Sequence, residues 1–196
     1  ELSGRYRCAL VIGAGNILRG SSLSTALGVR TRAAHYAGMT ATLVNGIVLS
    51  DLLTQAGCKN SIVSALSMPA VAHEMGLPAL DKIIESSDST PIFTGGIGTP
   101  YVTTDTTAVV RALQLEARFV LKLTNVDGIF SADPRKDSSA ERIPTISYDE
   151  YLKQQLAAID ATAVIMAREN KLPILVAKHR ASQPISGIIN SIHSAS

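Results

Sequence analysis

Short apolar runs alternate with helical patterns along this chain, and the alternation restricts the fold more than any other feature. The runs Cys8–Ile12, Ser61–Ala65, Pro91–Thr94, Arg118–Leu123 and Leu172–Ala177 predict buried strands. Helices between successive strands make the strands parallel, with right-handed crossovers. The pattern therefore predicts a layered α/β fold around a mainly parallel sheet.

Helix signals fill the segments between these runs. Ala33–Ala56 predicts a long helix that Gly57 closes, because glycine readily takes the left-handed conformation of a C-cap. Pro134–Pro144 is polar and predicts a loop. The other predicted helices are Pro78–Ser86, a helix capped by Thr104 or Asp105 that runs to Glu116, one from a capping box at Ser147–Glu150 to about Ala158, one from Asp160 to about Asn170, and Pro184–Ser194.

Composition narrows the class of protein. The 196 residues fit one domain, and 46% apolar but only 4% aromatic residues predict an aliphatic core. A net charge of +2 without a Lys/Arg run gives no indication of a nucleic-acid or membrane-surface partner. Cys8 and Cys58 have no metal-ligand spacing, so we expect no zinc site, no disulfide and a cytoplasmic protein. No uninterrupted run of about 18 apolar residues suggests a membrane span.

A first glycine motif, Gly13-Ala14-Gly15-Asn16, follows the first predicted strand, with Arg19 close behind. Glycine lets the backbone approach a phosphate, and successive N–H groups can ring its oxygens. Arg19 would add a fork of charged donors. The motif is neither a Walker A loop nor a complete GxGxxG, and a tight strand-to-helix turn explains its glycines equally well.

A second motif, TGGIGTPYVTTDTT, occupies Thr94–Thr107. Its three glycines follow a strand, and its hydroxyls crowd the start of a helix, where free N–H groups and the helix dipole favour anions. Capping of the helix accounts for one hydroxyl but not for the whole group. The motif favours a ligand site in which Thr103 and Thr104 bond phosphate or ribose.

A third motif begins at Lys122, where the fourth predicted strand ends, and continues through a polar turn at Asp127-Gly128 to Pro134. Lys122 could be an ordinary strand-end residue. Ligands of parallel sheets bind at the carboxyl ends of the strands, where all three motifs are expected to gather. A lysine there would help to stabilise a transferring phosphoryl group.

The three segments VIGAGNILRG, TGGIGTPYVTTDTTA and LKLTNVDGIFSADPRKD, in this order and spacing, resemble the bacterial uridylate kinases of the amino-acid kinase superfamily. The resemblance runs through essentially the whole chain and includes Ile159-Asp160 and Ala167–Ile174. It implies a three-layer αβα sandwich with a mainly parallel central sheet. It also implies transfer of the ATP γ-phosphate to UMP, and the Pro100…Thr103-Thr104-Asp105 core points to UMP rather than to an amino-acid substrate.

The resemblance also implies roles for single residues. Those expected to act in phosphoryl transfer are Arg19, Lys122, Asp105 and Asp160. Those expected to bind UMP are Ala14, Ile97, Gly98, Thr99, Pro100, Tyr101, Val102, Thr103 and Thr104. Those expected to bind ATP are Gly15, Arg19, Thr124, Phe130 and Asp133. Mg²⁺ would arrive with ATP, held by phosphate oxygens rather than by a protein metal site. The assembly would be a homohexamer regulated by GTP and UTP.

Two features depart from the family. Its members begin with a strand, a Lys-Leu-Ser-Gly-type phosphate loop and a helix, whereas Glu1-Leu2-Ser3-Gly4 stands too close to Gly13 to be that loop. We therefore expect residues 1–196 to be a single amino-acid-kinase-type domain that lacks this segment. His35 stands where the family has an aspartate that holds the UMP ribose, and a histidine at a helix start is more often a surface or cap residue.

Two other functions remain open at this point. One is a different enzyme of the superfamily, which would form an acyl phosphate or carbamoyl phosphate. The other is a nucleotide-binding regulatory protein without catalytic activity, which the missing lysine loop and His35 would suit.

Overall fold

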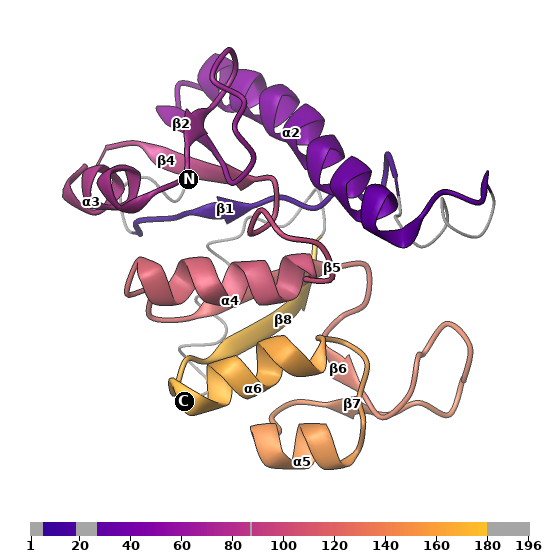
Figure 1. Cartoon of the computed structure of the whole chain (residues 1–196). Coiled ribbons are helices and arrows are strands. Elements are labelled where there is room, and N and C mark those ends of the chain that lie inside the picture. Colours follow the sequence, from indigo (N-terminus) through magenta and orange to yellow (C-terminus); the bar gives the residue numbers. More distant parts are fainter. Residues whose placement is uncertain (1–5, 19–26, 87, 180–196) are drawn as a thin grey trace. The chain divides into compact units, whose positions relative to one another are not determined.

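The computed structural model describes residues 6–18, 27–86 and 88–179, which form two compact units (Figure 1). Among the described residues, the N-terminal unit ends at Thr107 and the C-terminal unit begins at Ala108. Each unit has its own strands and is described by itself.

The N-terminal unit is built on a four-stranded parallel sheet with the order β1-β4-β2-β3. The strands are β1 (Leu10–Val11), β2 (Asn60–Ser64), β3 (His73–Glu74) and β4 (Thr90–Thr94). Ile62 pairs with Ile92 in the centre, and Leu10 pairs with Ile92 from the other side. Because the strands are parallel, the segments that leave β1, β2 and β4 start at the same edge of the sheet.

Two helices belong to this unit. The long helix α2 (Thr31–Gln55) packs on β2 and β4, and Gly57, with φ 77°, ends it as predicted. The shorter α3 (Leu77–Glu85) has Pro78 in its first turn. Its last carbonyls accept hydrogen bonds from the Arg7 guanidinium, at 2.9 Å from Ile83 O, 2.8 Å from Ile84 O and 3.0 Å from Ser86 O. A cation at this end also suits the helix dipole.

Helix α2 is apolar on more than one side. It buries Ala41 and Leu43, while Val44, Ile47, Val48 and Leu52 are exposed in the described structure. Among the described residues it is the one helix long and apolar enough to cross a membrane, judged by length and mean hydropathy. Helices that cover a sheet meet the same criteria, so this is weak support for a membrane span.

The C-terminal unit contains two strand pairs. β5 (Val120–Thr124) is parallel to β8 (Ile174–Lys178), and β6 (Ile129–Phe130) is antiparallel to β7 (Arg142–Ile143). Its helices are α4 (Thr104–Gln114), whose first turn lies in the N-terminal unit, α5 (Tyr148–Lys153) and α6 (Ala161–Glu169).

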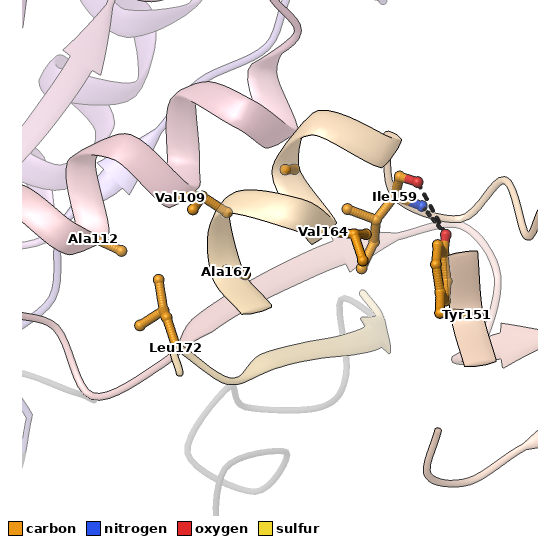
Figure 2. Close-up of a cluster of buried hydrophobic side chains, with 8 residues drawn as sticks. Val109, Ala112, Tyr151, Ile159, Val164, Ala167 and Leu172 are labelled. Atoms are coloured by element: carbon orange, nitrogen blue, oxygen red, sulfur yellow. Dashed lines mark hydrogen bonds between the residues drawn. The ribbon is translucent and has the colours of Figure 1, made fainter. Parts of the chain in front are cut away.

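The core of the C-terminal unit gathers side chains from α4, α5, α6 and the segments beside them (Figure 2). Its buried members are Val109, Ala112, Tyr151, Ile159, Ala163, Val164, Ala167 and Leu172. The Tyr151 hydroxyl accepts a hydrogen bond from Ile159 N at 2.6 Å and donates to Ile159 O at 3.0 Å. The one polar group of this core is therefore satisfied, as a buried phenol requires.

The α/β class and the mainly parallel pairing are confirmed, and each of the five predicted strands is present within two residues of its predicted bounds at either end. The helix predicted to reach Ala158 is too long. α5 ends at Lys153, and Gln155 has a φ of 52°, which a helix cannot contain. The loop predicted at Pro134–Pro144 includes the short strand β7. The helix predicted at Pro184–Ser194 lies outside the described residues.

Candidate active site

The segment after β1 turns sharply at the carboxyl edge of the N-terminal sheet. Ile12 N donates to Phe93 O of the neighbouring strand at 3.2 Å. The Ala14 carbonyl then accepts hydrogen bonds from Ile17 N at 2.9 Å and Leu18 N at 2.8 Å. Residues 13–16 thus form a closed turn rather than a loose loop, with Ala14 buried and Gly15 exposed.

A pair of asparagine amides holds this turn on α2. Asn45 Nδ2 donates to Gly13 O at 2.8 Å and to Asn16 Oδ1 at 2.7 Å. Asn16 Nδ2 donates in return to Asn45 Oδ1 at 3.1 Å. The turn is therefore fixed at both ends by one side chain.

The segment after β4 has an unusual backbone. Gly95, Gly96 and Gly98 have φ values of 73°, 58° and 84°, and Tyr101 has 70°. A Cβ at Gly95 would lie 2.9 Å from Leu66 N, and one at Gly98 would lie 2.9 Å from Ala65 O. The turn that follows β2 therefore leaves no room for side chains at these two glycines.

Side chains of α2 support the same segment. The Thr42 hydroxyl is buried, accepts a hydrogen bond from Gly95 N at 2.7 Å and donates to Met39 O at 2.7 Å. The ring of His35 lies 4.9 Å from the ring of Tyr101, with the two planes tilted by 52°. A left-handed tyrosine costs on the order of 1–3 kcal/mol, and such strain is common at functional sites.

The two glycine segments meet at the start of α4. A Cβ added to Gly13 would lie 3.7 Å from Thr104 Oγ1. Thr103 Oγ1 accepts from Thr106 N at 3.2 Å, so Thr103 is the N-cap, not Thr104 or Asp105 as predicted. The cap therefore lies one residue closer to the glycines, because the residue before the helix makes the capping bond to the third helical N–H.

In the C-terminal unit, Lys122 and Asp160 converge on one turn. Lys122 lies in the middle of β5 rather than at its end, and its ammonium donates to Ala158 O at 2.7 Å. Asp160 is the N-cap of α6, since its Oδ1 accepts from Ala163 N at 3.0 Å. Lys122 thus contacts the backbone of this turn, and Asp160 contacts the backbone of the helix that follows it.

Three of the residues predicted to hold ATP lie along β5, β6 and the loop after β6. Thr124 is the last residue of β5, Phe130 is in β6, and Asp133 follows in the loop. Arg135 forms a two-pronged ion pair with Asp133, with Nε–Oδ1 and Nη2–Oδ2 distances of 3.0 Å. Hydrogen bonds from the Arg135 side chain and main chain lower the pKa of Asp133 from its ordinary 3.8 to about 2.

The hairpin of β6 and β7 has its own anchor. Arg142 Nε donates to Asp127 O at 2.8 Å and lies 3.0 Å from the position of a Cβ on Gly128, whose φ is 107°. Across residues 6–18, 27–86 and 88–179, no three His, Cys, Asp or Glu side chains gather closely enough to hold a metal ion.

The sequence profile of the amino acid kinase family matches residues 1–178. The chain belongs to the amino acid kinase family. Among solved family structures, it is similar to UMP kinase from Ureaplasma parvum, with 32% identity and a TM-score of 0.89 over 97% of this chain and 80% of that one. It is also similar to UMP kinase from Bacillus anthracis, with 28% identity and a TM-score of 0.87 over 100% and 78%. The resemblance to the uridylate kinases is therefore confirmed.

A further solved structure is similar to this chain in fold alone. Uridylate kinase from Archaeoglobus fulgidus has 23% identity to the chain and a TM-score of 0.68, over 98% of this chain and 83% of that one.

Several residues that hold the predicted loops of the two units were not predicted. Asn45, Thr42 and Arg142 all bind the backbone of a predicted loop, and the turn at Ala65-Leu66 shapes the glycines. Asn45 had a visible signal, since an asparagine within the apolar run LVNGIV of a helix is unusual. Arg19 lies outside the described residues. Of the predicted UMP residues, Ala14 and those from Ile97 to Thr104 all belong to the two segments that meet.

Proposed function

We propose that the chain is a UMP kinase, which transfers the γ-phosphoryl group of ATP to UMP and releases UDP and ADP. One observation carries most of the argument. Within the N-terminal unit, the turn at Gly13–Asn16 and the glycine-rich segment that leads into α4 meet at the carboxyl edge of a parallel sheet. This edge is where such folds bind ligands, and the start of a helix suits a phosphate.

The N-terminal unit would bind the acceptor. Backbone N–H groups of the turn around Ala14 and the hydroxyls of Thr103 and Thr104 would receive the UMP phosphate. The loop from Ile97 to Val102, which contains Gly98, Thr99, Pro100 and Tyr101, would surround the nucleoside. Asp105, in the first turn of α4, would be an acidic neighbour needed for activity.

Residues of the C-terminal unit would bind the donor nucleotide. Thr124, Phe130 and Asp133 would hold the ATP nucleoside, and Gly15 and Arg19 would add contacts to ATP. Lys122 would neutralise charge on the transferring phosphoryl group, near Asp160. Mg²⁺ would come with ATP on phosphate oxygens, the ligands that this ion prefers, and we assign no protein ligand to it.

The reaction needs positioning more than proton transfer. The acceptor oxygen of UMP is already an anion, so no general base is required. The protein then contributes by aligning two phosphates and by placing N–H groups and cations on the equatorial oxygens.

Two other functions compete with this proposal, and the proposal itself includes the location, assembly and effectors of the protein. The enzyme could instead form an acyl phosphate or carbamoyl phosphate, or the chain could bind nucleotides without turnover. A cytoplasmic homohexamer with GTP and UTP as effectors follows from the resemblance to uridylate kinases.

The test is ADP release by the full-length protein with ATP, Mg²⁺ and UMP, compared with CMP, aspartate, acetate and carbamate as acceptors. We expect release with UMP that exceeds release with every other acceptor. Faster release with a carboxylate or carbamate would replace the proposal with the second enzyme class. Binding of UMP without any ADP release would indicate a regulatory protein.

A further inference from the structure

Asn45 occupies an unusual place for an asparagine. It lies in the middle of α2, between Val44 and Gly46, in a run of otherwise apolar residues. Asparagine is a poor helix former, because its amide competes for backbone hydrogen bonds. Here the half-buried amide bonds to the turn after β1, across 29 and 32 positions of sequence. Its cost to the helix is offset by contacts outside the helix.

The hydrogen bonds of Asn45 hold the turn at two points, Gly13 and Asn16. Its Nδ2 reaches Gly13 O and Asn16 Oδ1, while its Oδ1 accepts from Asn16 Nδ2. Ala14 and Gly15 lie between these two fixed points. The turn itself closes through the N–H groups of Ile17 and Leu18, both bonded to Ala14 O. Asn45 therefore fixes the path of the backbone that carries the N–H groups of Ala14, Gly15 and Asn16.

We infer that Asn45 is a positioning residue, whose amide holds the Gly13–Asn16 turn in the shape that binds phosphate. The inference rests on the proposed role of this turn in UMP phosphorylation. Only an amide serves here, because the side chain must donate to two oxygens and accept from a third group. An aspartate of the same shape would turn an oxygen toward Gly13 O and Asn16 Oδ1 and would push the turn away.

The variants Asn45→Asp and Asn45→Ala test the inference. A displacement of about 1 Å in a phosphoryl-transfer site lowers activity by roughly a hundredfold. We expect Asn45→Asp to lower kcat/KM for UMP by about that factor and Asn45→Ala by about tenfold, with KM for UMP rising in both. The KM of ATP for each variant shows whether the turn serves one substrate or both.

Asn60→Ala is the matched control. Like Asn45, Asn60 is an amide that bonds to residues outside its own helix or strand: its Nδ2 lies 3.1 Å from Ser50 O, 3.0 Å from Thr54 Oγ1 and 3.0 Å from Cys58 O. It lies at the start of β2, the opposite end of the strand from the glycine segments. Its loss should lower Tm about as much as the loss of Asn45 while leaving kcat/KM within about twofold.

A readout without turnover separates this inference from the proposed function. Amide hydrogen exchange of Ile17 and Leu18, whose N–H groups close the turn on Ala14 O, should be at least about tenfold faster in nucleotide-free Asn45→Asp than in the parent chain. Unchanged exchange and unchanged kcat/KM would overturn the inference, whatever reaction the enzyme performs. If the parent chain releases no ADP with UMP, the proposed function fails, and hydrogen exchange still decides whether Asn45 holds the turn.

Asn16→Ala provides a second route should Asn45→Asp fail to fold. Asn16 is exposed, so its truncation removes half of the amide pair at little cost to the fold. It should reproduce the faster exchange at Ile17 and Leu18. Exchange at the parent rate in this variant would count against the reciprocal amide pair.

Discussion

The Lys122 ammonium donates a hydrogen bond to the main-chain carbonyl of Ala158 over 2.7 Å, and so ties the middle of β5 to the turn that precedes Asp160. The bond gives Lys122 a structural role beside the catalytic one that we propose. A hydrogen bond from a charged group contributes about 1.5–3 kcal/mol to stability. Substitution of Lys122 therefore has to be judged by turnover and stability together.

Lys122→Ala should slow turnover by roughly a hundredfold, since loss of one charged donor raises such a barrier by about 3 kcal/mol. Steady-state ADP release and thermal unfolding measure the two effects. Lys153→Ala, which removes an exposed lysine of α5, should change neither. A large fall in Tm with turnover intact would leave Lys122 with its structural role alone.

Thr103→Ala should lower the stability of the protein by about 1 kcal/mol, because it removes the N-cap of α4. For a chain of this length, that corresponds to a fall in Tm of about 2–4 °C. Thr103→Ser keeps the hydroxyl and should unfold near the parent temperature in the same calorimetric scan. Equal Tm values for the alanine variant and the parent would show that the cap lies elsewhere.

Gly38→Ala and Gly46→Ala should change stability in opposite directions although both lie in α2. A Cβ at Gly38 meets nothing within 4 Å, so alanine should raise stability by about 0.5–1 kcal/mol. A Cβ at Gly46 would lie 2.5 Å from Thr94 Cγ2, in a strand residue that is 2% exposed. Forcing Thr94 to move should cost about 1–3 kcal/mol. Urea unfolding of both variants measures the difference, and shifts of the same sign would refute the packing of α2 on β4.

The Asp133 carboxyl should titrate near pH 2 in the parent chain and close to 3.8 in Arg135→Gln, because Arg135 is the main cause of the lowered pKa. A carboxyl whose pKa is lower in the folded state favours folding above the unfolded value of about 3.9. That contribution disappears as the pH falls toward 2. Carbon-13 NMR of the side-chain carboxyl follows the titration directly. An unshifted midpoint in the Arg135 variant would mean that the ion pair does not form in solution.

Local signals predicted the elements that local chemistry controls. Gly57 ends α2, and Asp160 caps α6, because a left-handed glycine and a capping carboxylate act within a few residues. The apolar runs located the strands for a similar reason, since burial on both faces of a parallel sheet requires them. The Gly13 and Thr104 segments were also expected to meet, because parallel strands end at one edge.

Contacts distant in sequence were not predictable in the same way. Nothing near Asn45 indicates that its partner is Gly13, and the short pairs β6 and β7 have too few residues to show a strand period. Lys122 was placed at a strand end because the predicted strand stops at Leu123 and the polar turn begins at Thr124. In the structure both of them pair with β8.

We propose that the segment after β4 binds UMP, and its backbone would then limit which other acceptors the protein can be altered to take. Gly95 and Gly98 are restricted twice, once by left-handed φ and once by a neighbouring backbone atom 2.9 Å from any added Cβ. Randomising these two positions in directed evolution toward a new acceptor would therefore yield no useful variants, because neither position accommodates a side chain. Substitutions at Ile97, Thr99 and Val102 would change side chains without changing the glycine backbone. Substitutions at His35 would change the ring that contacts Tyr101.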